Sequence, residues 1–124
     1  MVAVTPQRKI LVVDDHEPDA ELVAAMLSPR YRVFAANSSE DALSVFDRED
    51  PDLVILDLRL GDGAGGIGIF QAIRRRLGHA PKAILVSSAD EAEDSARAAH
   101  MPMLRKPLRQ RPLLDMVDRV MGGR

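Results

Sequence analysis

Residues 51–60 read Pro-Asp-Leu-Val-Ile-Leu-Asp-Leu-Arg-Leu, and this stretch decides the fold. Four consecutive apolar residues, 53–56, lie between turn-forming residues, a pattern typical of a short strand buried on both faces. The strand ends at Asp57, and the glycine-rich loop 61–66 follows. Because open α/β sheets bind their ligands at the carboxyl ends of their strands, Asp57 is a candidate site residue.

The composition of the 124-residue chain is that of one globular domain, predicted to span residues 9–121 between short tails at 1–8 and 122–124. With 17 basic and 19 acidic residues the net charge is -2, which gives no chain-wide attraction to nucleic acid. Cysteine is absent, so disulfides and thiol chemistry are excluded. No apolar run approaches the roughly 18 residues of a membrane span, and the start of the chain lacks a signal-peptide pattern. We therefore expect a cytoplasmic protein with neither a nucleic-acid nor a membrane partner.

Apolar runs alternate with helical patterns along the chain. Strands are predicted at residues 9–13, 31–36, 53–57, 83–86 and 103–106, and helices near 18–27, 38–46, 67–77, 90–99 and 112–121. Such alternation favours a parallel sheet with right-handed crossovers and helices on both faces, a three-layer α/β/α sandwich. The runs at 10–13, 53–56 and 83–86 are apolar throughout and should lie inside the sheet, whereas the more polar run 31–36 should lie nearer an edge.

Polar side chains follow four of the predicted strands. They are Asp14 and Asp15 after the first strand, Asp57 at the third, Ser87 after the fourth and Lys106 at the fifth. Each alone would usually have an ordinary turn or surface role, but the carboxyl ends of parallel strands share one rim, so we expect all five to meet there. Three carboxylates so close repel one another unless a cation intervenes. Lys106 supplies one positive charge, and Mg²⁺ suits the remainder. A carboxylate beside Mg²⁺ can act as a nucleophile toward a phosphoryl group.

With these residues in place, the chain resembles the receiver domain of two-component response regulators over about residues 8–121. The resemblance rests on the acidic pair 14–15, on Asp57 after an apolar strand, on Ser87, and on Lys106 followed by proline. It implies a flavodoxin-like, five-stranded parallel sheet of strand order 2-1-3-4-5.

The resemblance also implies roles at the metal site. Asp57 would be the phosphoacceptor. Asp15 would bind Mg²⁺ directly, and Asp14 would assist through water or by positioning. The backbone carbonyl of Arg59 would be a further Mg²⁺ ligand.

Ser87 and Lys106 would contact the phosphoryl group. In the family an aromatic residue three positions before the lysine rotates inward as the serine moves, but Met103 stands there in this chain. An aromatic gate is therefore excluded. Ser87 and Met103 are the candidate switch residues, because methionine fills gaps readily and so permits switching. Residues 99–102 lack the family's usual Gly-Ala and resemble the receivers of hybrid histidine kinases.

The partners implied by the resemblance are a sensor histidine kinase or a histidine phosphotransfer protein, which donates from a phosphohistidine. A receiver is not an enzyme for a separate substrate, because it catalyses only its own phosphorylation and dephosphorylation. No DNA-binding or catalytic domain follows residue 121, so we expect a single-domain regulator that signals through altered protein contacts. The output partner is not specified by the sequence, and a homodimer is one option.

The loop 61–66 offers a rival interpretation, because its Gly-x-Gly-x-x-Gly pattern follows a strand, opens a helix and precedes Asp90, as in a dinucleotide fingerprint. Asp57 would then point a carboxylate toward the pyrophosphate, and the chain is too short for the two-half nucleotide fold. An aspartyl-nucleophile phosphatase would need a second aspartate where Arg59 stands. A degenerate receiver that serves only for docking is the remaining alternative.

Overall fold

The computed structural model describes residues 7–60, 65–88 and 100–122. Its elements in chain order are β1 (Lys9–Val13), α1 (Glu17–Leu27), β2 (Arg32–Ala36), α2 (Ser39–Glu49), β3 (Leu53–Asp57), α3 (Gly65–Leu77), β4 (Ala83–Ser87), β5 (Met103–Arg105) and α5 (Gln110–Val120). The helix predicted at residues 90–99 lies outside the described residues. Within the described ranges, every helix is too short or too polar to span a membrane.

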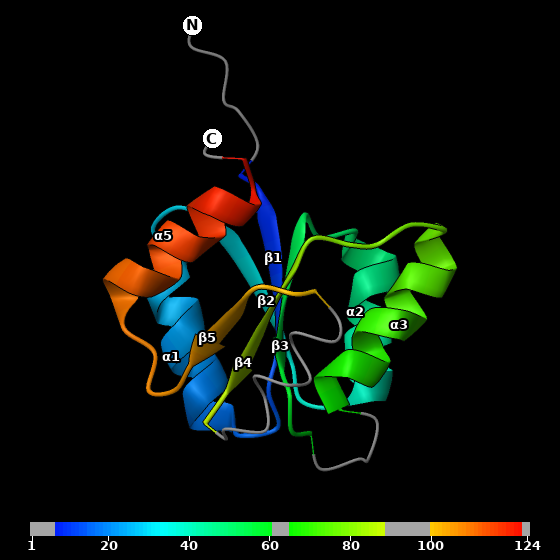
Figure 1. Cartoon of the computed structure of the whole chain (residues 1–124), viewed down its shortest axis with the longest axis horizontal. Helices are drawn as coiled ribbons and strands as arrows, with labels where there is room; N and C mark the ends of the chain where they lie inside the picture. Colours follow the sequence, from blue (N-terminus) through cyan, green and yellow to red (C-terminus); the bar gives the residue numbers. More distant parts are fainter. Residues whose placement is uncertain (1–6, 61–64, 89–99, 123–124) are drawn as a thin grey trace, which may run out of the picture.

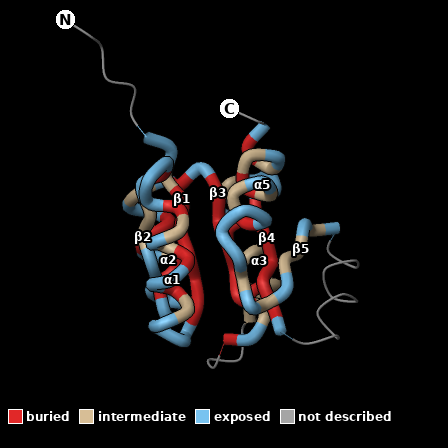
Figure 2. Tube along the Cα trace, turned by 90° about the vertical axis from the view of Figure 1, so that its left-hand side faces the viewer, coloured by how far each residue is buried: buried red, intermediate tan, exposed pale blue. Residues whose placement is uncertain are grey.

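The five strands form one parallel sheet of order β2-β1-β3-β4-β5, which confirms the predicted topology. Helices α1 and α5 cover one face of this sheet, and α2 and α3 cover the other (Figure 1). Every residue of β3 and β4 is buried, whereas the edge strands β2 and β5 are partly exposed (Figure 2). The apolar runs therefore lie inside the sheet, as predicted.

Side-chain alternation along the inner strands divides the interior into two cores. The α2/α3-side core contains, from the inner strands, Leu11, Val13, Val54, Leu56, Ala83 and Leu85. The α1/α5-side core contains, from the same strands, Ile10, Val12, Leu53, Ile55, Ile84 and Val86. Burying each large apolar side chain contributes about 1.5–3 kcal/mol, so both helical layers are held to the sheet mainly by these residues.

The start of β2 differs from the prediction by one residue. The strand begins at Arg32, because the backbone N–H of Tyr31 still donates to the carbonyl of Leu27 at the end of α1, at 2.9 Å. The Tyr31 ring packs in the α1/α5-side core, and its hydroxyl lies 2.8 Å from a carboxylate oxygen of Asp118 on α5. Burial, and then the neighbouring Asp118, raises the pKa of Tyr31 above its ordinary value. The contact ties the turn after α1 to the last helix.

An alkaline titration reads out this contact directly, because the chain has one tyrosine and no tryptophan. We expect the phenol absorbance of the folded protein to change at a higher pH than the ordinary pKa of about 10. In Asp118→Asn the midpoint should fall back toward that of the protein unfolded in guanidinium. The midpoint of the variant should stay above that of the unfolded protein, because burial is the larger cause of the raised pKa. A midpoint in Asp118→Asn equal to that of folded wild-type protein would contradict the contact.

Two boundaries near the carboxyl end also differ from the prediction. Strand β5 ends at Arg105, so Lys106 stands just beyond the strand. Helix α5 begins at Gln110, and Pro112 therefore lies within its first turn rather than opening it. Proline is tolerated there because the first N–H groups of a helix have no partner within it.

Candidate functional site

Asp14 is fixed by the turn that joins β1 to α1. Its side-chain Oδ1 accepts a hydrogen bond from the backbone N–H of His16 at 2.9 Å, and its own N–H donates to the carbonyl of Ala36 at 3.0 Å. Asp14 is buried and Asp15 is exposed. The turn thus directs one carboxylate inward and leaves its neighbour at the rim.

Asp57 is the last residue of β3 and is only 8% exposed. Its Oδ1 accepts a hydrogen bond from the backbone N–H of Arg59 at 3.1 Å. Burial raises the pKa of the Asp57 carboxyl to about 6; the hydrogen bond from Arg59 opposes this shift, and the charge of Asp14 adds to it. Without a metal, the carboxyl of Asp57 therefore becomes fully ionised only above about pH 6.

Asp14, Asp15 and Asp57 form an acidic cluster, in which one carboxylate oxygen from each lies within 4.8 Å of the others. Hard oxygen donors at this spacing are the ligands that Mg²⁺ prefers. A divalent cation would also relieve the mutual repulsion that contributes to the raised pKa of Asp57. The donor set therefore fits the predicted magnesium ion.

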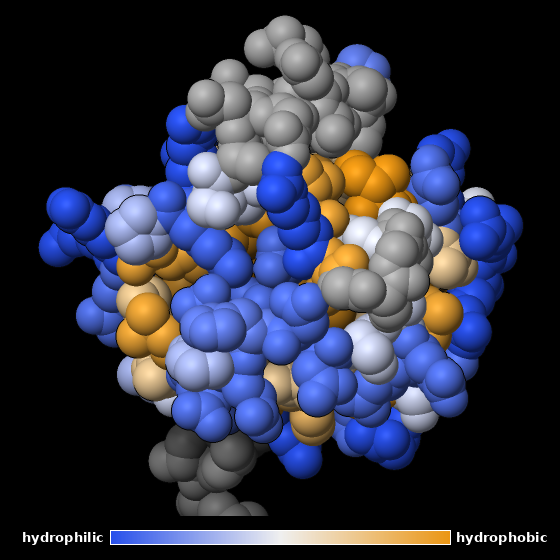
Figure 3. Space-filling view, turned by 90° about the horizontal axis from the view of Figure 1, so that it is seen from below, coloured by the Kyte–Doolittle hydropathy of each residue, from blue (hydrophilic) through white to orange (hydrophobic). Residues whose placement is uncertain are grey.

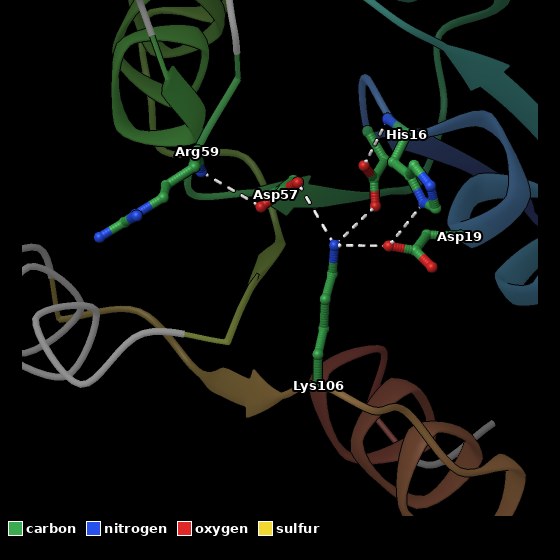
Figure 4. Close-up of polar contacts among 6 residues, drawn as sticks. His16, Asp19, Asp57, Arg59 and Lys106 are labelled. Atoms are coloured by element: carbon green, nitrogen blue, oxygen red, sulfur yellow. Dashed lines mark hydrogen bonds and ion pairs between the residues drawn. The ribbon is translucent and has the colours of Figure 1, made fainter.

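Lys106 joins the same site from the far edge of the sheet. Its backbone N–H donates to the carbonyl of Ser87 at 3.0 Å, which holds it against the end of β4. Its ammonium lies 3.0 Å from Asp19, 3.1 Å from Asp14 and 3.4 Å from Asp57 (Figure 4). Burial opposes the charge of Lys106, but the hydrogen bonds to Asp19 and Asp14 outweigh it and raise the pKa of the ammonium.

Gly65 and Gly66, at the end of the stretch 61–66, belong to helix α3 rather than to a loop, a correction to the predicted helix start at residue 67. A Cβ on Gly66 would lie 2.6 Å from the backbone oxygen of Asp57, and one on Gly65, where φ is +66°, would lie 2.8 Å from the carbonyl oxygen of Leu58. These glycines let α3 approach the end of β3. Close packing accounts for Gly66, the last glycine of the fingerprint; residues 61–64 lie outside the described part.

The remaining predicted residues have the following places. Ser87 is buried at the end of β4, and Arg59 is exposed just after Asp57. Met103 is partly buried on β5 and packs against the α2/α3-side core. The structure thus brings Asp14, Asp15, Asp57 and Lys106 together. The metal-ligand and switching roles, and the role of the Ser87 hydroxyl, stay predictions.

Sequence reasoning missed Asp19. It lies in the first turn of α1, where an acidic residue is ordinarily explained by the helix dipole. The rule that residues at the carboxyl ends of parallel strands lie close together says nothing about a residue on a helix. Its contact with Lys106 depends on how α1 packs beside the β5–α5 connection.

A cavity of about 300 Å³ lies beside the site, between α1 and residues 106–108. Its walls include Leu22, Val23 and Leu108, and Leu22 is 51% exposed. Figure 3 looks onto the end of the molecule where the strands finish, and hydrophilic side chains cover most of this face with apolar surface between them. Within the site, Asp15 and part of Lys106 are accessible to solvent, and apolar side chains border the cavity beside them.

Comparison with known proteins agrees with this geometry. The family model for the response regulator receiver domain matches residues 10–118. A putative response regulator from Chloroflexus aurantiacus is 25% identical, with 95% of this chain and 99% of that chain covered and a TM-score of 0.84. The receiver domain of NtrX from Brucella abortus is also 25% identical, with 93% and 99% covered and a TM-score of 0.82. The chemotaxis protein CheY4 of Vibrio cholerae, 23% identical, shares the fold with a TM-score of 0.82 over 92% of this chain and 98% of that chain. The family match extends over nearly all of the sheet and both helical layers, and the chain belongs to the response regulator receiver domain family.

Proposed function

We propose that Asp57 accepts a phosphoryl group from a phosphohistidine of a sensor histidine kinase or a phosphotransfer protein in the cytoplasm. The observation that supports this most directly is the setting of Asp57. It is a buried carboxylate with two further carboxylates within 4.8 Å and an ammonium at 3.4 Å. The acidic cluster suits a metal, and Lys106 suits an incoming anion.

In the proposed reaction, a carboxylate oxygen of Asp57 attacks phosphorus. A P–O bond forms and the P–N bond breaks, and the imidazole leaves with the electron pair and takes up a proton. Lys106 donates a hydrogen bond to a phosphoryl oxygen, and the Ser87 hydroxyl donates another. Hydrolysis by water later returns the carboxylate, so the protein catalyses only its own modification.

Mg²⁺ would be held by Asp14, Asp15, Asp57 and the backbone carbonyl of Arg59. When bound, it supplies positive charge against the phosphoryl oxygens. Because the metal-free pKa of Asp57 is about 6, the nucleophile is already ionised at neutral pH.

The signal is proposed to leave through altered protein contacts made by one domain, residues 9–121 with short tails. A phosphoryl group adds roughly two negative charges beside Lys106. A bias of a few kcal/mol is enough to move a two-state equilibrium. Ser87 and Met103 are the proposed moving parts, and the receiving surface belongs to an output partner or to a second copy of the chain.

Acetyl phosphate with Mg²⁺, read by intact mass, tests this function. We expect the mass of one phosphoryl group to be gained, and the gain to disappear with EDTA or in Asp57→Asn. Asp52→Asn, on the opposite end of the same strand segment, removes an exposed carboxylate of the same type and serves as the control. No gain in wild-type protein would favour the docking-only alternative, and an unchanged gain in Asp57→Asn would place the phosphoryl group elsewhere.

A further inference from the structure

The ammonium of Lys106 has three carboxylate partners, and the nearest is outside the acidic cluster. Asp19 Oδ2 lies 3.0 Å away, whereas Asp57 Oδ2 is the most distant at 3.4 Å. A lysine ammonium has three protons to donate, so these contacts use its full capacity. Asp19 thus shares an ammonium that would otherwise be divided between Asp14 and Asp57 alone.

Asp19 is held firmly enough to act as a fixed anchor. Its backbone N–H donates to the carbonyl of His16 at 3.0 Å in the first turn of α1, and His16 Nδ1 lies 3.1 Å from the same Oδ2. The hydrogen bond from Lys106 lowers the pKa of Asp19, which keeps it charged. The side chain of Asp19 is 39% exposed and that of Lys106 is 21% exposed, so the pair lies at the solvent edge of the site.

We propose that Asp19 is a positioning residue for Lys106. The carboxylate of Asp19 draws the Lys106 ammonium toward α1 and so leaves Asp14 and Asp57 available to Mg²⁺. This inference rests on the proposed function. An ammonium and a divalent cation compete for the same carboxylate oxygens. Without the charge of Asp19, Lys106 has only Asp14 and Asp57 left as partners, and the metal must displace a stronger ion pair.

The space around Lys106 permits its ammonium to shift between Asp19 and the two carboxylates Asp14 and Asp57. Asp14, Asp19, Asp57 and Lys106 all border the cavity of about 300 Å³ beside α1. The lysine is fixed at its backbone by Ser87 but reaches the carboxylates through a flexible four-carbon stem. The position of its charge is therefore set by the carboxylates around it, and Asp19 is the one that does not also serve the metal cluster.

Magnesium titration by calorimetry or amide NMR tests the proposal on the purified, unphosphorylated protein. We expect Asp19→Asn to bind Mg²⁺ about fivefold more weakly at low ionic strength, the order of one partly exposed ion pair. Asp19→Glu, which keeps the charge, should restore most of the affinity. Glu21→Gln removes an exposed carboxylate from the same helix without touching Lys106, and should change the affinity less than twofold.

A second background separates positioning from a direct pull of Asp19 on the metal. In Lys106→Met the competing ammonium is gone, so Mg²⁺ should bind more tightly and Asp19→Asn should then have little effect. An equal loss in both backgrounds would show that Asp19 acts by its own field, and no loss in either would show no role; both overturn the inference. Failure of wild-type protein to take up a phosphoryl group would instead count against the proposed function, because this titration requires no phosphorylation.

Discussion

Asp57→Asn is expected to make the metal-free protein more stable than wild type at pH 7, by about 2 kcal/mol, while abolishing phosphoryl uptake. The stabilisation follows from the raised pKa of Asp57. The carboxyl ionises near pH 6 when folded and near 3.8 when unfolded, and each unit of difference corresponds to about 1.4 kcal/mol. Asparagine still accepts the hydrogen bond from Arg59, and the attraction of Lys106 is already contained in the pKa of Asp57, so the full shift is an upper bound on the gain.

The pH dependence fixes the sign of this effect. Below about pH 3 the Asp57 carboxyl is protonated in both folded and unfolded protein, so it has no effect on the free energy of unfolding. Between about pH 4 and 6 the folded protein binds the proton and the unfolded chain does not, so wild-type stability falls as pH rises. Above about pH 6 the ionised Asp57 carboxyl lowers the free energy of unfolding by nearly the full amount. The advantage of Asp57→Asn should therefore be nearly absent at about pH 3, grow from about pH 4 to 6, and be complete by about pH 7.

Urea unfolding in EDTA at several pH values measures this difference. Subtracting the two proteins at each pH cancels the titration of every other carboxyl group. Saturating Mg²⁺ should then stabilise wild-type protein and reverse the order, because the variant has lost one of the three clustered carboxylates. A constant difference from pH 4 to pH 7 would contradict the raised pKa, and equal phosphoryl uptake would remove Asp57 as the acceptor.

Gly66→Ala is expected to lose about 3 kcal/mol of stability and to slow phosphoryl uptake. The added methyl group would meet the backbone oxygen of Asp57 at 2.6 Å, and the side chain of Leu85 at 3.1 Å. A flexible side chain could move aside, but the nearest obstacle is backbone of a buried central strand. Helix α3 or the end of β3 must shift, and overpacking of this kind typically costs 1–3 kcal/mol or more.

Gly78→Ala is the matched control, because Gly78 ends the same helix with a positive φ of 79° and has open space around it. It should lose only about 1–2 kcal/mol, the cost of a left-handed conformation, and should leave phosphoryl uptake unchanged. Chemical unfolding and the acetyl phosphate reaction measure both variants. Equal losses of stability and uptake in the two would show that Gly66 has no special relation to Asp57.

Much of the fold and part of the site can be predicted from the sequence, because both depend on strand order. Apolar runs ending in Asp14, Asp57 and Ser87 are local signals, and the rule for parallel sheets converts them into a shared rim. Lys106 follows the same logic from an edge strand. The positions of these residues can be predicted without knowing how the side chains pack.

The parts that could not be predicted depend on packing between elements. Asp19 reaches Lys106 only because α1 and the β5–α5 connection lie side by side, which no pattern within either segment indicates. Gly65 and Gly66 look like loop residues, since glycine is a poor helix former. Their place inside α3 follows from its close approach to β3, a tertiary constraint that overrides the local preference.

The division of the interior into two cores has a consequence for how such a domain can diverge. Among the described residues, no side chain belongs to both cores, because the sheet stands between them. Substitutions on opposite sides should therefore be nearly additive, whereas those within one core should be coupled. Each helical layer can therefore accept substitutions without compensating substitutions in the other layer. The side chains at the strand ends are the exception. They come from strands in the middle and at the edge of the sheet, so substitutions in either layer must preserve their positions.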